Sequence, residues 1–216
     1  MKIGILGSGV VGQTLGTKLA SLGHSVKMGS RTPANAEASA WAKKTGEGAS
    51  HGTFADAAHH GEMLFNCTLG EASLEALRSA KASDLVGKIL VDVSNALDFS
   101  KGMPPALLLP STDSLAEQIQ RAFPEARVVK ALNTVAAPLM VDPGRLQKGA
   151  HSIFICGNDP TAKKAVQELL EVGFGWKDVV DLGDVSMARG TEAYLLLWTR
   201  LYMKFQNPEF NIRIVR

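Results

Sequence analysis

The feature that most constrains this chain is a glycine-rich turn that begins at its seventh residue. Gly7, Gly9 and Gly12 have the spacing G-x-G-x-x-G, between an apolar run over Lys2–Leu6 and an amphipathic run over Val10–Leu22. A strand, such a turn and a helix open the α/β unit that binds dinucleotides, because the helix N-terminus offers free N–H groups to a pyrophosphate. The residues predicted to bind this pyrophosphate are Gly7, Ser8, Gly9, Val10, Val11 and Gly12.

The rest of the chain alternates short apolar runs with longer amphipathic ones. The short runs predict strands over Lys2–Leu6, Ser25–Met28, Met63–Cys67, Lys88–Val93, Arg127–Lys130, Ser152–Cys156 and Asp178–Leu182. The long runs predict helices over Val10–Leu22, Ala34–Lys44, Thr53–His60, Ser73–Ala80, Ser114–Ala122, Thr161–Val172 and Ser186–Phe205. We expect a loop over Gly102–Leu109 and an edge strand over the alternating Phe210–Val215. This pattern predicts one doubly wound α/β domain over residues 1–216, with a mostly parallel sheet and a C-terminal helix and tail, 185–216, packed on it.

The end of the second predicted strand favours NADP over NAD. An NAD site normally places Asp or Glu there for the ribose 2′-hydroxyl, whereas an NADP site lacks the acid and has Arg nearby. Here Ser30, Arg31 and Thr32 follow the strand, and no acidic residue precedes Glu37. We predict that Ser30 and Arg31 bind a 2′-phosphate, since a hydroxyl can donate to it and a guanidinium can form a bidentate pair. The alternative for Ser30 and Thr32 is that one of them caps the next helix.

Small, amide and apolar side chains follow three later strands. The carboxyl ends of parallel strands meet at one edge of a sheet, so these side chains are expected at the same crevice. They suit a flat ring that carries a carboxamide, and the two asparagines can each donate and accept. The alternative for the asparagines is an Asx turn or a helix cap. The candidates at these strand ends are Thr68, Leu69, Asn95, Asn133 and Ala136.

The composition excludes several other classes of function. The net charge is +2 without a Lys/Arg run, so nucleic acid is not an expected partner. No run of about 18 apolar residues is present, which predicts no membrane span and a cytoplasmic location. Cys67 and Cys156 lie in apolar runs and are expected to be core residues. His59 and His60 have no metal-ligand spacing, and no nucleophile motif occurs, so neither a metal nor a catalytic side chain is predicted.

The last predicted helix carries an apolar stripe, formed by Trp198, Tyr202, Met203 and Phe205. We expect this stripe to face the core, and the alternative is that it walls a cofactor pocket. The same apolar helix would also suit a homodimer.

Three segments together resemble a known family. They are residues 1–32, VVKALNTV at 128–135 and DLGDVSMARGTEAY at 181–194. These segments resemble the NADPH-dependent coenzyme F420 (deazaflavin) reductases, and they are similar to the cytosolic oxidoreductase domain of the six-transmembrane metalloreductases. The resemblance implies that Ser30 and Arg31 grip the 2′-phosphate, and that Thr68–Leu69, Asn95 and 131–136 line the nicotinamide side. It also implies direct hydride transfer between stacked rings, without a general acid or base.

Two features depart from the family pattern. The helix after Arg31 lacks a further basic residue near its start, where Asn35 stands instead. The C-terminal YMKFQNPEFNIRIV does not identify the second ring, so the acceptor stays open between coenzyme F420, another flavin and a different molecule.

Three functions follow as hypotheses. The first is an NADPH-dependent oxidoreductase with a flavin-like acceptor, and it is favoured. The second is an NADPH-dependent dehydrogenase or reductase of a small carbonyl or imine, which would normally need a substantial helical domain with Lys, His or Asp catalytic groups. The third is a non-catalytic sensor that only binds NADPH.

Overall fold

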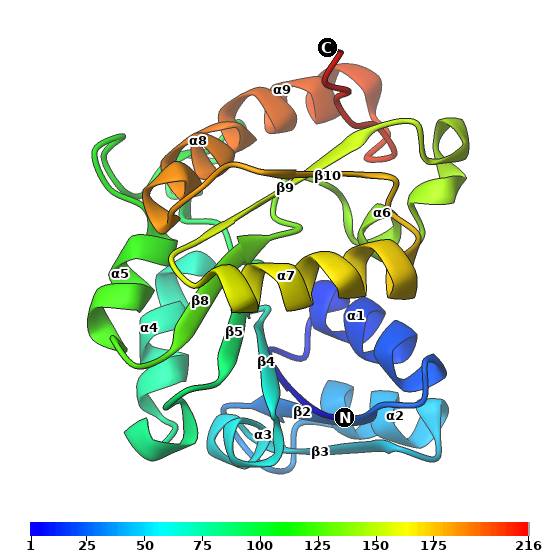
Figure 1. The fold of residues 1–216 in the computed structure, drawn as a ribbon, viewed down its shortest axis with the longest axis vertical. Helices are drawn as coiled ribbons and strands as arrows, with labels where there is room; N and C mark the ends of the chain where they lie inside the picture. The colour runs from blue at the N-terminus through cyan, green and yellow to red at the C-terminus, as the bar shows by residue number, and fades with distance from the viewer. Residues whose placement is uncertain (216) are drawn as a thin grey trace.

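An eight-stranded sheet runs through the computed structural model, which describes residues 1–215 (Figure 1). The order of its strands is β10-β9-β8-β5-β4-β1-β2-β3. Their bounds are β1 (Lys2–Leu6), β2 (Ser25–Ser30), β3 (Ala49–Thr53), β4 (Met63–Asn66), β5 (Ile89–Asp92), β8 (Arg127–Ala131), β9 (Ser152–Gly157) and β10 (Asp178–Asp181). Neighbours from β3 to β8 in this order are parallel, β9 is antiparallel to β8, and β10 is parallel to β9. The predicted doubly wound, mostly parallel α/β fold is confirmed.

Helices cover both faces of the sheet, and each face has its own apolar cluster. One face packs on α1 (Val10–Ser21), α2 (Ala36–Thr45), α6 (Ala137–Val141) and α7 (Pro160–Glu168). The other packs on α3 (Phe54–His60), α4 (Gly70–Arg78), α5 (Leu115–Ala122) and α8 (Ala188–Ala193). The chain then continues into α9 (Leu195–Phe205). Short 3-10 turns lie at η1 (Ala82–Asp84), η2 (Pro143–Arg145), η3 (Gln147–Gly149) and η5 (Val185–Met187).

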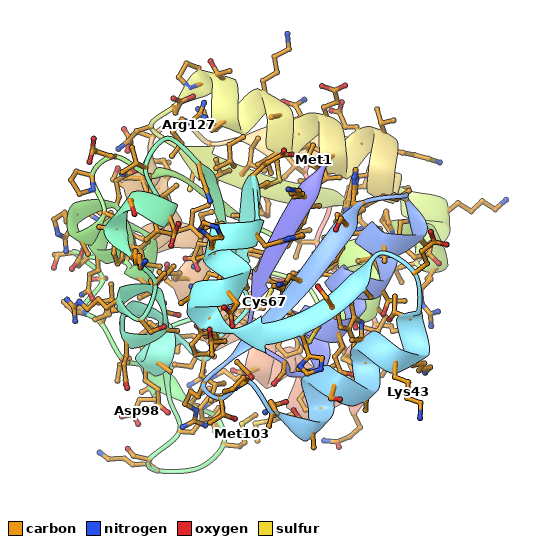
Figure 2. All side chains as sticks on the ribbon, turned by 90° about the horizontal axis from the view of Figure 1, so that it is seen from below. Met1, Lys43, Cys67, Asp98, Met103 and Arg127 are labelled. Carbon is orange, nitrogen blue, oxygen red and sulfur yellow. The ribbon has the colours of Figure 1, made fainter. Side chains whose placement is uncertain are left out.

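The carboxyl ends of the central strands lie along one edge of the sheet. In Figure 2, Met1 and Arg127 mark the starts of β1 and β8 at one edge, and Asp98 and Met103, which follow β5, lie at the opposite edge. The order of the strands reverses beside β1, since β2 and β3 lie on one side of it and β4, β5 and β8 on the other. Ligands of such sheets bind at this switch point, beyond the carboxyl ends of the strands.

The sequence pattern did not predict every strand correctly. β3 has the sequence ASHGT, which lacks an apolar alternation, and it forms because it pairs with β2 at the sheet edge. Within the predicted loop, β7 (Ala106–Leu107) pairs with β6 (Leu97–Asp98) in a short antiparallel ribbon. The predicted edge strand over Phe210–Val215 is wrong, because this segment has no strand structure. Ser152 N donates to Ile212 O (3.0 Å), and Asn211 Nδ2 and Ile214 N donate to Ser152 O (2.8 Å) and Ser152 Oγ (2.9 Å), so the segment is joined to the start of β9 without a strand ladder.

Two predicted helices differ from the observed ones. The last predicted helix is divided into η5, α8 and α9, which meet at Met187 and Tyr194. α7 ends at Glu168 and continues as a π-helical turn, η4 (Leu169–Phe174), before Gly175 stops it with a positive φ of 87°. Within residues 1–215, no helix has both the length and the hydropathy that a bilayer span requires.

The predicted core stripe on the last helix is wrong for three of its four residues, whereas Trp198 is half-buried. Tyr202, Met203 and Phe205 are exposed, because α9 lies at the periphery and buries only Leu195 and Thr199. Exposed apolar side chains on one helix suit contact with a second copy of the chain. The homodimer stays a prediction.

Candidate dinucleotide site

The glycine-rich turn joins β1 to α1 and lies against the end of β4. Gly7 has a φ of 123°, and a Cβ there would lie 2.6 Å from Cys67 O. A Cβ on Gly12 would lie 2.0 Å from Gly7 O, so no larger residue allows α1 to approach the turn this closely. The backbone itself therefore requires the first and third glycines.

Gly9 differs from the other two glycines, since a Cβ there would meet nothing within 4 Å. Gly9 is the exposed N-cap of α1, and this helix has no side-chain cap and no acidic residue in its first turn. In contrast, Asn35 and Ser114 cap α2 and α5. The open space and the uncapped N–H groups fit a phosphate, because the positive end of the helix dipole attracts an anion there. Gln13 Nε2 donates to Ser8 O (2.8 Å) and fixes the turn from the helix side.

Ser30 and Arg31 lie at the end of β2, next to the start of α2. The Ser30 side chain is buried, and its hydroxyl donates to Thr32 O (2.7 Å), so it shapes the turn. Arg31 is exposed and has no ion pair or hydrogen bond with any other residue in the range 1–215, which leaves its guanidinium available. The alternative in which Ser30 or Thr32 caps the next helix is wrong. Asn35 is the cap, and its side chain accepts from Ala38 N (2.9 Å).

Two large apolar side chains are exposed at the ends of neighbouring strands. Val10 begins α1 after β1 and is 74% exposed, and Leu69 is the N-cap of α4 after β4 and is 71% exposed. Thr68 is held in place instead, because its hydroxyl bonds to Asn66 Oδ1 (2.7 Å) and Ser73 Oγ (2.8 Å). The predicted residues after β1 and β4 therefore present apolar surface at the switch point.

Asn95 and Asn133 bond to each other across the ends of β5 and β8. Asn95 Nδ2 donates to Asn133 O (2.9 Å), and Asn133 Nδ2 donates to Asn95 Oδ1 (3.0 Å) and to Thr191 O of α8 (3.1 Å). Neither asparagine is the N-cap of a helix, so the helix-cap alternative is wrong for both of them. Ala136 is the N-cap of α6 and lies on the same loop.

A row of buried polar side chains lies beneath this edge, and the sequence analysis missed it. Asn66, Asp92 and Lys130 are register partners on β4, β5 and β8, and each is at most 1% exposed. Asn66 Nδ2 donates to Asp92 Oδ1 (2.8 Å), and Lys130 Nζ pairs with Asp92 Oδ2 (2.8 Å) and with Glu192 Oε1 of α8 (2.9 Å). The available signal was the pair of opposite charges within the runs VDV and VVKA, which were interpreted as apolar strands.

The surroundings keep Lys130 charged. Burial lowers the pKa of Lys130, but the carboxylates of Asp92 and Glu192 outweigh this effect and hold its pKa above the usual value. Glu192 also accepts from Leu115 N (2.9 Å) and Ala116 N (3.2 Å) at the start of α5. A lysine sealed in this way cannot reach a substrate as a general acid.

The two cysteines and His59 supply neither a nucleophile nor an acid–base group at this edge. Burial raises the pKa of Cys156 to about 12, and it raises the pKa of Cys67 further, so both stay neutral thiols. His59 lies at the end of α3, away from the turn, and pairs with Asp84 (3.0 Å). Among residues 1–215 no group of three His, Cys, Asp or Glu side chains is placed to hold a metal ion.

A switch point with an uncapped glycine turn and a free arginine after β2 defines a dinucleotide-binding protein of the Rossmann class. Residues 2–96 match the family model described as NADP oxidoreductase, coenzyme F420-dependent. The F420-dependent NADP reductase of Methanocaldococcus jannaschii is 32% identical over 161 residues, which are 74% of this chain and 70% of that protein. The chain belongs to this F420-dependent family of NADP-dependent oxidoreductases, as its resemblance predicted.

Two further comparisons agree with this family. The crystal structure of a putative F420-dependent NADP reductase from Arthrobacter sp. FB24 is 49% identical and covers 100% of both chains, with a TM-score of 0.95. The metalloreductase STEAP3 of Rattus norvegicus is 34% identical over 200 residues, which are 89% of this chain and 36% of that protein. This chain therefore spans little more than a third of the metalloreductase.

Proposed function

We propose that this protein transfers hydride between NADP(H) and a flavin-like acceptor, and that coenzyme F420 is this acceptor. The observation that carries the proposal is the chemistry of the crevice edge. Two charged side chains beneath the edge, Asp92 and Lys130, are sealed in an ion pair, while small, amide and apolar side chains follow β1, β4, β5 and β8 at the edge. Reduction of a carbonyl needs a proton donor within hydrogen-bond reach, whereas hydride transfer between stacked rings does not. Membership of the family supports F420 as the acceptor.

The start of α1 and two residues after β2 would hold NADP(H). The N–H groups at the start of α1 would bind the pyrophosphate in the space in front of Gly9. The free guanidinium of Arg31 would pair with the 2′-phosphate, and Thr32, which is exposed beside it, has a hydroxyl to donate. When bound, NADPH supplies the hydride.

The residues at the strand ends would position the reacting rings. Val10 and Leu69 would exclude water from the edge with their exposed side chains. The Asn95–Asn133 pair would keep the ends of β5 and β8 at a fixed separation. Alignment of two reactants contributes up to about 7–11 kcal/mol to the lowering of a barrier, so positioning alone can account for catalysis of this kind.

The acceptor is tested by mixing the protein and NADPH with a deazaflavin, FMN, FAD and a panel of carbonyls and imines. We expect NADPH oxidation with the ring acceptors and none with the carbonyls or imines. Oxidation with a carbonyl or imine alone would support the dehydrogenase alternative, and binding without any oxidation would support the sensor alternative.

Deuterated NADPH tests the hydride step itself. We expect deuterium from one face only of NADPH to appear in the reduced deazaflavin, which keeps a carbon-bound label. Loss of the label to water at the transfer step would contradict direct transfer, and so would inactivation by substitution of His51, His59 or His60 alone.

Asn133→Ala is expected to lower the rate of hydride transfer by about 10-fold without abolishing it. The change removes two hydrogen bonds of Asn133 Nδ2, each worth roughly 0.5–1.5 kcal/mol. Single-turnover rates measure the effect. Asn158→Ala is the matched control, because its amide accepts one bond from Val185 N beyond β9 (3.0 Å), and its rate should stay near that of the unchanged protein. Complete inactivation by Asn133→Ala would mean that this amide does more than align the rings.

A further inference from the structure

The buried row beneath the crevice, extended by α8, connects the segments that border the crevice. We call it the Lys130 network, and its members are Asn66, Asp92, Lys130 and Glu192. After β4, the Thr68 hydroxyl donates to Asn66 Oδ1 (2.7 Å). After β5, the Ser94 hydroxyl donates to Asp92 Oδ1 (2.6 Å), and Ser94 O accepts from Lys130 Nζ (2.5 Å). The network therefore holds the first residues of both segments in place.

The same network fixes α8 against the end of β8. Glu192 pairs with Lys130, and its neighbour Thr191 accepts through its carbonyl from Asn133 Nδ2 (3.1 Å). Asn133 in turn bonds to Asn95. One turn of α8 is thus tied both to the buried lysine and to the amide pair at the crevice edge.

Stability alone gives a weak reason for three buried charges. Removal of a charged group from water is costly, and a buried ion pair often stabilises a fold no more than apolar side chains of the same volume. Here two carboxylates share one lysine, and the N–H groups of Leu115 and Ala116 balance the second carboxylate. What this arrangement does provide is one defined geometry for the groups that it joins.

We propose that Lys130 is a positioning residue for hydride transfer: through Asp92 and Glu192 it fixes the segments after β4, β5 and β8 relative to α8. The proposal rests on the function proposed above. Among residues 1–215, no side-chain hydrogen bond joins the network to the glycine turn or to Arg31, so its loss should disturb the alignment of the nicotinamide while NADPH stays bound.

Glu192→Gln is the first test, because it keeps the size of the side chain and one acceptor oxygen for α5 while it removes the charge that faces Lys130. We expect kcat with NADPH and a deazaflavin to fall at least about 10-fold, since small misplacements of reacting groups are costly. The Kd of NADPH should change less than about 3-fold, since the phosphate contacts remain. If the Lys130→Met variant folds, its kcat should fall further than that of Glu192→Gln. If it does not fold, Glu192→Gln alone tests the positioning role.

Lys163→Met is the matched control. Lys163 Nζ also pairs with a carboxylate, Asp181 (2.9 Å), and donates to a backbone carbonyl, Gly183 O (2.9 Å), but it joins α7 to β10 and not to the crevice. Its kcat, its Kd for NADPH and its exchange pattern at the crevice should remain those of the unchanged protein. An equal fall in kcat for Lys163→Met and Glu192→Gln would overturn the proposal.

Two measurements without an acceptor separate this proposal from the proposed function. Amide hydrogen exchange of the free protein should rise in Glu192→Gln at residues 94–96 and 132–134, and not across the sheet as a whole. The nicotinamide emission of bound NADPH should shift toward that of free NADPH. Should no ring acceptor react with the unchanged protein, the proposed function fails while these two measurements still decide the positioning role. Unchanged emission and exchange, or a proportional change of kcat and Kd, would overturn that role.

Discussion

Gly9→Val is expected to abolish NADPH binding while the fold stays native. The added side chain meets nothing within 4 Å, and Gly9 has an extended backbone with φ −74° and ψ −176°, which valine adopts readily. The same side chain would fill the space in front of α1, where we place the pyrophosphate. The loss of two charge-assisted hydrogen bonds there corresponds to at least about a 100-fold weaker affinity. Circular dichroism and a calorimetric titration with NADPH, done on the same sample, measure both parts.

Gly12→Val provides the contrast to this variant. Its Cβ would lie 2.0 Å from Gly7 O, so it should lose the native circular dichroism together with binding. If Gly9→Val bound NADPH with near-native affinity and structure, the glycine turn would not be the phosphate site.

Arg31→Ala is expected to weaken the affinity for NADPH by about 10- to 150-fold and to leave the affinity for NADH almost unaffected. A charge-assisted contact to the 2′-phosphate is worth roughly 1.5–3 kcal/mol, and only NADPH carries this phosphate. No side chain among residues 1–215 competes for the guanidinium, so the free protein should lose no stabilising contact. Fluorescence titration with both dinucleotides gives the ratio of the two affinities.

Lys43→Ala is the control for a general effect of charge. Lys43 is an exposed cation on α2, the helix that follows Arg31 along the chain, and its removal should alter the two affinities equally and slightly. Equal losses of NADPH and NADH affinity in Arg31→Ala would show that Arg31 does not bind the 2′-phosphate.

The features that the sequence predicted are those with a local physical cause. The turn over 7–12 is such a case, because a positive φ at Gly7 and the close approach at Gly12 are needs of a few adjacent residues. Strands built on an apolar run, such as β1 and β4, were predictable from their composition. The position of Arg31 after β2 followed from the same local reasoning, while its contact with a cofactor stays a prediction.

The features that were missed depend on register between distant segments. Asp92 and Lys130 are 38 residues apart and meet only because β5 and β8 are neighbours in this register. β3 forms because β2 offers it an edge, although its own residues have little preference for a strand. Similarly, the exposed face of α9 could not be distinguished from a core face, since helical periodicity shows that a stripe exists and not what covers it.

The role of Glu192 has a consequence for how the chain can be divided. This carboxylate, late in the sequence, provides acceptors for the first N–H groups of α5, which lies 76 to 77 residues earlier, and the second partner of Lys130. A chain that ended before α8 would leave these N–H donors of α5 without their acceptors. It would also leave the fully buried Lys130, on β8, with one carboxylate partner instead of two. The nucleotide-binding half is therefore not a transferable cassette. Grafts or circular permutations that use this fold should keep α8 covalently in place, and new termini are better sought in the exposed stretch 99–104 between β5 and α5.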